Sequence, residues 1–485
     1  MGIVFRQSMN NTIVTYLGFG IGAINVLFLY TNFMADEYYG LIQVILSAST
    51  ILMPLLAFGV PNTLVKFYSG FNDPKKQEGF LTLMLLLPLV LIVPMALVSF
   101  LANEAIGNFL ARENPVVKDY VWYIFLIGMA MAYFEVFYAW ARIHMKSVFG
   151  NFMKELFCRL GQTLLLVLLY FDLITVDFFI KSLVGLYLAR TIFMKLSAFR
   201  LRMPKLSFNF PTNMGKILTY SALIILGGST AIVLLEVDKV MLNQYIRIEN
   251  VAYYSVAGFM ASAVGVPTRA MHQITYPLTA KLLNENDMGA LKQLYRKSSL
   301  TLFLICGFLF VLLLLNLNDL YTLLPESYRG GLVIVFWIGM AKVSDAIMGN
   351  NNSILYNSDY FQAVLFMGVG LAVLTVLFNL WLIPAYGLKG AAIASFSAFL
   401  IYNLIKLLFV RWKYGLLPFS NDTLKVFALL LVTAAIFYYV RFPFHAIINI
   451  GLKAILMILL YTGVLYRLRI SEDVFGVISK FFKKN

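Results

Sequence analysis

Charged residues are scarce in this chain. Asp, Glu, Lys and Arg make up 13% of its 485 residues, whereas 61% are hydrophobic. No polar stretch is long enough to form a soluble domain, so the composition excludes a globular protein held by a single anchor. We expect an integral membrane protein.

Residues that carry chemistry are also few. The two cysteines, Cys158 and Cys306, both lie in apolar runs, so no structural disulfide is expected. The three histidines, His144, His272 and His445, have no metal-ligand spacing, and the sequence holds no CxxC, Walker loop or HExxH motif. We therefore expect no cofactor, no metal site and no enzyme activity.

Apolar runs of 18 or more residues predict an all-α polytopic membrane protein with about fourteen transmembrane helices. The first run is expected to stay as a helix, because no small-residue cleavage site follows it. The predicted spans cover about 11–33, 40–65, 79–101, 120–141, 153–171, 176–198, 217–244, 250–277, 298–317, 331–355, 361–383, 388–410, 424–441 and 444–466.

The net charge of +15 comes from short basic clusters between these spans. Such clusters are typical of the positive-inside rule and argue against nucleic-acid binding. They gather on the side of the N-terminus, and Lys406, near the end of the span 388–410, is counted among them. Because the number of spans is even, both termini of this multi-pass protein are predicted to lie in the cytoplasm, under a bacterial inner membrane.

The two halves of the chain repeat. A shift of 215 residues lays Tyr38, Tyr39 and Gly40 onto Tyr253, Tyr254 and Ser255, and superposes six spans on six. We predict two parallel six-helix bundles, residues 1–205 and 206–420, followed by two accessory helices and a basic tail in 421–485. Transporters built from such repeats bind between the halves and alternate access by rocking.

Four short motifs carry a family resemblance. They are Glu37-Tyr-Tyr-Gly-Leu, Phe58-Gly-Val-Pro-Asn-Thr-Leu-Val-Lys-Phe-Tyr, Leu235-Glu-Val-Asp-Lys-Val-Met-Leu-Asn and Asn250-Val-Ala-Tyr-Tyr-Ser. With six plus six plus two helices, the chain resembles the oligosaccharide-lipid flippase and polysaccharide exporter (Wzx-like) branch of the multidrug/oligosaccharidyl-lipid/polysaccharide (MOP) superfamily. That superfamily also holds drug extruders, which typically stop at twelve helices, and lipid II flippases.

The candidate substrate site consists of basic residues inside the spans. Arg269 lies roughly 18 Å along the helix from Lys281, where a guanidinium facing lipid would cost at least ~3 kcal/mol. We expect it to line a polar interior, as the resemblance to lipid II flippases also implies for a helix 8 arginine; the alternative is an arginine satisfied by carbonyls freed at Pro267. Lys342, Arg190 and Arg159 are the further candidates. Arg159 could equally form a local pair with Glu155, four residues before it.

Acidic residues inside the spans are candidates for coupling or gating. Glu135 suits proton coupling if it is buried without a partner, and a basic residue on a neighbouring helix is the alternative. Asp345 lies one helical turn after Lys342, so the two could form a self-neutralising pair. Asp238 and Lys239 could gate helix 7 or belong, with Glu236, to a salt-bridged rim. The family often has arginine at the position of Lys239, and lysine lacks its two-pronged hydrogen bonding.

The resemblance implies a flippase that moves a polyprenyl-diphosphate-linked oligosaccharide from the cytoplasmic to the outer leaflet, for cell-surface polysaccharides such as O-antigen. Two alternatives stay open, a cation-coupled multidrug (MATE-like) exporter and a membrane glycan polymerase or ligase. Expected partners are the lipid-linked oligosaccharide and membrane lipid, with a polysaccharide polymerase as a candidate; the protein is expected to act as a monomer. Coupling to H⁺ or Na⁺ is left open.

Overall fold

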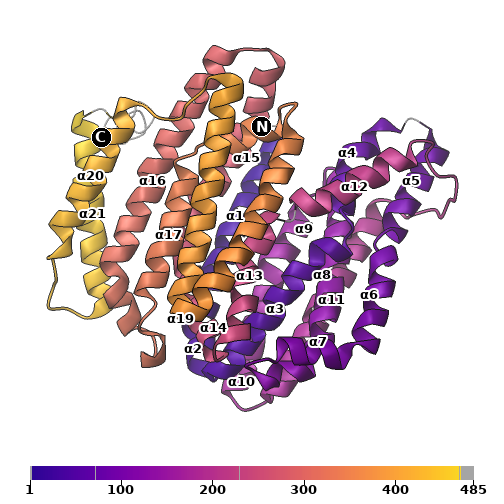
Figure 1. The fold of residues 1–485 in the computed structure, drawn as a ribbon, viewed down its shortest axis with the longest axis horizontal. Coiled ribbons are helices and arrows are strands. Elements are labelled where there is room, and N and C mark those ends of the chain that lie inside the picture. The colour runs from indigo at the N-terminus through magenta and orange to yellow at the C-terminus, as the bar shows by residue number, and fades with distance from the viewer. Residues whose placement is uncertain (1–2, 72, 229, 469, 471–485) are drawn as a thin grey trace. The chain divides into compact units, whose positions relative to one another are not determined.

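The computed structural model describes residues 3–71, 73–228, 230–468 and 470. Every element in these residues is a helix (Figure 1), which confirms the all-α class. Each of the fourteen predicted spans is mostly helical in the described residues, although short breaks interrupt several of them and the spans 361–383 and 388–410 lie in one helix that is kinked at Gly387. Eight stretches of the described chain are long and apolar enough, by length and composition, to cross a membrane. The count of fourteen crossings stays a prediction.

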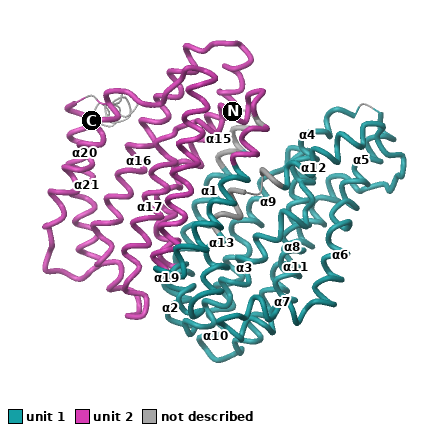
Figure 2. Tube along the Cα trace, in the orientation of Figure 1, with its two compact units in different colours: residues 1–255, 368–387 teal, residues 256–367, 388–485 magenta. Residues whose placement is uncertain are grey.

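Packing divides the chain into two compact units (Figure 2). Unit 1 comprises residues 1–255 and 368–387, and unit 2 comprises 256–367 and 388–485. These units group residues by contact, whereas the predicted boundaries at 205 and 420 follow the sequence repeat and stay a prediction.

Unit 1 is built around the long helix α8, which packs against both α3 and α11. Its helices are α1 (Ile3–Ile24), η1 (Asn25–Leu29), α2 (Tyr30–Phe33), α3 (Asp36–Leu56), α4 (Val60–Phe67), η2 (Tyr68–Gly70), α5 (Pro74–Leu86), α6 (Leu89–Leu101), α7 (Asn103–Leu110), η3 (Pro115–Tyr120), α8 (Val121–Ile143), α9 (Val148–Phe152), η4 (Met153–Phe157), α10 (Cys158–Tyr170), α11 (Val176–Leu201), α12 (Met214–Gly228), α13 (Thr230–Tyr245) and the start of α14 (Glu249–Ser262).

Unit 2 is centred on α16, against which α15, α17, α20 and α21 pack. Its helices are the end of α14, η5 (Ala263–Gly265), α15 (Val266–Asn284), α16 (Met288–Thr322), η6 (Glu326–Tyr328), α17 (Leu332–Ala346), α18 (Asn351–Tyr356), the parts of α19 (Phe361–Tyr414) outside 368–387, α20 (Asn421–Tyr438) and α21 (Ala446–Leu468).

Glycines in left-handed conformations break two of the predicted spans. Gly59 has φ 65° between α3 and α4, and a Cβ there would collide with the backbone of Ser221. Gly349 has φ 56° between α17 and α18, where a Cβ would press on Ser298 and Ser299 of α16. Only glycine tolerates both the dihedral and the close approach, so these breaks are fixed by the sequence.

Accessory helix α21 is held to α16 by a buried polar contact. Lys453 is 4% exposed and donates to the carbonyl of Leu315 at 3.0 Å, with Asp319 at 3.9 Å. A lysine buried in this way needs such partners, because an isolated ammonium would cost far more in an apolar environment. The contact therefore fixes the register of α21 along α16.

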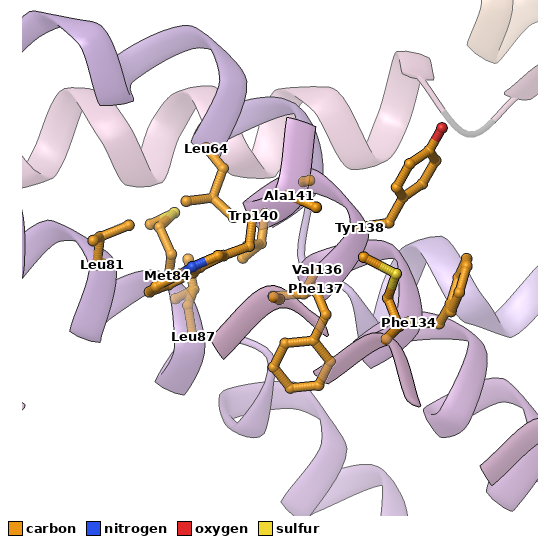
Figure 3. Close-up of a cluster of buried hydrophobic side chains, with 14 of the residues drawn as sticks. Leu64, Leu81, Met84, Leu87, Phe134, Val136, Phe137, Tyr138, Trp140 and Ala141 are labelled. Atoms are coloured by element: carbon orange, nitrogen blue, oxygen red, sulfur yellow. The ribbon is translucent and has the colours of Figure 1, made fainter. Parts of the chain in front are cut away.

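A large core cluster among the described residues of unit 1 lies at the end of α8 (Figure 3). Trp140 is fully buried there among Leu64, Phe80 and Met84, from α4 and α5. Aromatic side chains dominate core energetics because of their size and their close packing. This core holds in place the C-terminal part of α8, which follows Glu135.

Replacing Trp140 with alanine should therefore destabilise the protein by about 3–5 kcal/mol, the usual cost of truncating a buried tryptophan. Unfolding in an SDS titration, followed by circular dichroism, measures the change. The matched control is Trp381→Ala, because Trp381 is 71% exposed and should matter little. Equal effects of the two substitutions would show that the Trp140 cluster is not a stabilising core.

Candidate functional site

Arg269 lies near the start of α15, just after a break in the eighth predicted span. The 3₁₀ turn η5 and Pro267 separate α14 from α15. Thr268 points inward, with its hydroxyl 3.7 Å from the sulfur of Cys306 on α16, whereas the next residue, Arg269, is exposed. Within the described residues Arg269 forms no ion pair. The side chain of Arg269 is therefore accessible to a ligand beside α15.

Lys342 on α17 lies within electrostatic range of Arg269. Its aliphatic stem packs against Gly265, at 3.4 Å from the position of a Cβ, and its ammonium lies 5.4 Å from the ring centre of Phe399. Asp345 is also within electrostatic range, but its ion pair is with another residue. The two cations, Arg269 and Lys342, therefore lie near each other, and Lys342 also lies against the turn η5 that precedes Arg269.

The partner of Asp345 is Lys406, which the sequence analysis counted among the basic residues on the cytoplasmic side although it lies inside the predicted span 388–410. Lys406 lies within α19, and counting it as a loop cation is wrong because its side chain is 1% exposed. Its ammonium is 3.8 Å from Asp345 and donates to Asn352 at 2.9 Å. The sequence does carry a signal for a buried lysine, because Lys406 is a single lysine inside an apolar run. The positive-inside count treated it as a cytoplasmic residue, so this signal was overlooked.

These residues form one group, here called the Asp345 cluster. His272 of α15 completes it, within electrostatic range of Asp345 and Lys406. The cluster holds one arginine, two lysines, one histidine and one carboxylate, and comprises Arg269, His272, Lys342, Asp345 and Lys406. With neutral histidine it carries a surplus of positive charge. In a low-dielectric setting such a surplus favours binding of an anion.

Unit 1 holds the other two predicted cations. Arg190 is 6% exposed and its guanidinium stacks at 4.1 Å from the ring centre of Phe134 and 4.8 Å from that of Tyr187. Its Nε has no hydrogen-bond partner in the part of the chain described. Arg159 pairs with Glu155 at 3.5 Å, so the local pair is confirmed.

Glu135 is neutralised by a neighbouring helix. Its carboxylate lies 2.6 Å from the ammonium of Lys154 on η4, which bears out the alternative of a basic partner. Because a paired carboxylate stays ionised, this contact does not by itself provide a group that exchanges protons.

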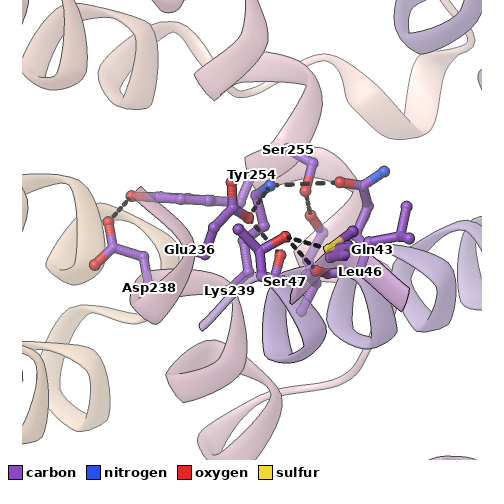
Figure 4. Close-up of polar contacts among 11 residues, drawn as sticks. Gln43, Leu46, Ser47, Glu236, Asp238, Lys239, Tyr254 and Ser255 are labelled. Atoms are coloured by element: carbon purple, nitrogen blue, oxygen red, sulfur yellow. Dashed lines mark hydrogen bonds and ion pairs between the residues drawn. The ribbon is translucent and has the colours of Figure 1, made fainter. Parts of the chain in front are cut away.

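The acids of α13 are bound to neighbouring helices (Figure 4). Asp238 is 3% exposed and accepts hydrogen bonds from the hydroxyl of Tyr254 and, at 2.7 Å, from the amide of Asn379. Lys239 pairs with Glu236 at 2.9 Å, and Glu236 also accepts from Ser47 of α3 at 2.6 Å. The salt-bridged rim is confirmed for Lys239, while a gating role for either residue stays a prediction.

The structure thus brings together only part of the predicted site. Arg269, Lys342 and Asp345 belong to one cluster of unit 2. The remaining candidates, Arg190, Arg159, Glu135, Asp238 and Lys239, lie in unit 1. Lys406 and His272 are the members of the Asp345 cluster that the sequence analysis missed.

Asp345→Asn should destabilise the protein by about 2–3 kcal/mol, because it leaves the buried Lys406 without its counter-charge. The cost lies below that of a fully buried pair, since Asp345 is 32% exposed and Asn352 still binds Lys406. Adding Lys406→Met should recover most of the loss, as measured in the SDS titration.

Asp422→Asn is the matched control for this pair. Asp422 pairs with Lys425 at 2.8 Å on the surface of α20, where both side chains are more than one-third exposed. The change should cost less than about 1 kcal/mol. A double variant no more stable than Asp345→Asn alone would contradict the proposed dependence of Lys406 on Asp345.

Comparisons with known proteins agree with this fold. A family model described as "polysaccharide biosynthesis protein" matches residues 4–283, more than half of the chain. No curated protein matches. Among solved structures, the chain is similar to the lipid II flippase MurJ in an inward closed conformation, at 14% identity and a TM-score of 0.72, covering 95% of this chain and 99% of that one.

Multidrug transporters share the fold over a shorter part of the chain. An inward-facing MATE family transporter of the MOP superfamily is 15% identical with a TM-score of 0.63, over 83% of this chain and 94% of its own. An outward-facing one is 14% identical with a TM-score of 0.53, over 84% and 95%. At these identities the likeness establishes the fold alone.

Proposed function

Because this chain belongs to the polysaccharide biosynthesis protein family and has the fold of MOP-superfamily transporters, we propose that it is a flippase for a polyprenyl-diphosphate-linked oligosaccharide. It moves this lipid from the cytoplasmic to the outer leaflet of the bacterial inner membrane by alternating access, with both termini in the cytoplasm. The reaction makes and breaks no covalent bond.

The observation that carries the proposal is the surplus of positive charge in the Asp345 cluster. A diphosphate bears negative charge that the hydrocarbon core cannot solvate, so the headgroup needs cations along its path. Arg269 offers two parallel N–H donors, the geometry that suits phosphate oxygens, and Lys342 adds a point charge beside it. Lys406 forms the ion pair with Asp345, so one carboxylate serves three basic side chains.

A multidrug exporter is the second candidate because its fold is similar. An organic cation would need acids left without a basic or hydrogen-bonding partner. Four acids at the predicted spans have such partners instead: Glu135 has Lys154, Glu236 has Lys239, Asp345 has Lys406, and Asp238 accepts two hydrogen bonds. The charges of the Asp345 cluster favour an anionic substrate.

Reconstituted vesicles separate the candidate functions in one experiment. A lipid-linked oligosaccharide is placed in one leaflet and its appearance in the other is followed with a membrane-impermeant glycosidase. Transfer without growth of the glycan supports the flippase. Growth of the glycan indicates a polymerase, and export of a fluorescent organic cation without glycan transfer indicates a drug exporter.

Arg269→Ala should lower the transfer rate by roughly thirtyfold, equivalent to about 2 kcal/mol for a lost charge-assisted contact. Arg269→Lys should retain part of the activity, because it keeps the charge and loses the paired donors. Arg296→Ala is the matched control, since Arg296 is an exposed arginine on α16 outside the cluster. A wild-type transfer rate for a correctly inserted Arg269→Ala protein would show that Arg269 does not take part in substrate binding.

A further inference from the structure

The connection between α11 and α12 is an ordered, non-helical segment of unit 1. Residues 202–210, here called the connecting segment, run past α5 (Figure 1). The buried hydroxyl of Thr82 accepts from the amide of Ser207 at 3.0 Å; its proton is shared between the carbonyl of Glu78 in α5, at 2.9 Å, and that of Lys205, at 3.3 Å. A Cβ at Gly79 would collide with the carbonyl of Asn209, so glycine is required for this close approach.

The first residue of the segment is fixed as well. The guanidinium of Arg202 donates to the hydroxyl of Tyr68 at 2.9 Å and to Gln77 at 2.7 Å. The segment is therefore attached to η2 and α5 along its length. Its conformation is set by specific contacts, so the side chains that it leaves exposed are presented in a defined place.

Those exposed side chains are large and apolar. Met203 and Leu206 are each 70% exposed and Phe208 is 71% exposed, with Phe210 beside it at 6.2 Å between ring centres. The non-helical backbone excludes the hydrocarbon core, where unpaired amides and carbonyls are too costly. Bulk water is unfavourable for a patch of this kind. The membrane–water interface satisfies both the backbone and the side chains.

The segment and the chain around it are strongly basic. The acids there are Asp73 and Glu78. The exposed cations are more numerous, namely Lys66, Lys75, Lys76, Lys195, Arg200, Lys205 and Lys216. Burial and the nearby charge of Lys216 lower the pKa of Lys66, so cations of α4 and α12 are close enough to repel each other. Anionic headgroups would relieve this repulsion, at about 1 kcal/mol for each lysine near the surface.

We propose that the connecting segment docks on the membrane surface and binds anionic phospholipid headgroups, with Met203, Leu206 and Phe208 inserted between lipids and Lys205 and Lys216 on the phosphates. The basic residues belong to loops predicted to be cytoplasmic, and that leaflet carries the anionic lipid. The docking site is independent of the transported molecule.

The test uses the full-length protein labelled at Phe208→Cys with a polar environment-sensitive maleimide. Both native cysteines are buried, so the introduced thiol is the one that reacts. The protein is reconstituted in phosphatidylcholine, with and without phosphatidylglycerol. Quenching by spin-labelled lipid is compared with quenching by aqueous iodide. The control is the same label at Glu326→Cys, whose side chain is 86% exposed in unit 2.

The label at position 208 should be quenched mainly by the lipid, and more so with phosphatidylglycerol, whereas the label at 326 should be quenched mainly by iodide. Lys205→Gln with Lys216→Gln should lower the ratio of docked to undocked segment by about fivefold for each lysine. The same label at Leu206→Cys, a second exposed position of the segment, tests whether the result at position 208 reflects only a local effect of that substitution.

Iodide quenching at 208 as strong as at 326, in both membranes, would overturn the proposal. It would identify a water-facing surface of the kind that a soluble protein binds. Lipid quenching that is the same with and without phosphatidylglycerol would overturn the assignment of anionic headgroups. Monodisperse elution of each variant in detergent establishes that the protein is folded.

Discussion

One imbalance of charge governs the candidate site: a single carboxylate, Asp345, stands among three cations. Lys406 is the most buried of them and requires Asp345 most, so the carboxylate is committed to it. Arg269 and Lys342 are then left near each other without an acid of their own in the described part of the cluster. Two like charges in a membrane protein repel strongly unless an anion lies between them.

Breaks in the helices place these charges. The turn η5 and Pro267 restart the helix just before Arg269, and Gly349 ends α17 soon after Asp345. The stem of Lys342 lies against Gly265 of η5. The local chemistry of glycine and proline thus decides where the cations lie, and the apolar helices around them supply the low-dielectric setting.

Much of the fold could be predicted from the sequence. Apolar runs long enough to span a bilayer give the helices directly, because in lipid the helix satisfies its own backbone hydrogen bonds. Arg269 and Lys342 were identifiable for the same reason, as charges at a depth where charge is costly. The partner of Asp345 was not, because pairing across helices depends on packing that spacing along one helix does not contain. Asp345 therefore seemed matched to Lys342, one turn away, although Lys406 of α19 forms its ion pair.

Lys406 also shows how one sequence rule can hide another. A lysine near the end of a span satisfies the positive-inside rule, and that rule is silent on whether the side chain reaches water. The same uncertainty applies to acids. Glu135 on α8 and Asp238 on α13 look alike in sequence, yet one meets an ammonium and the other two neutral donors.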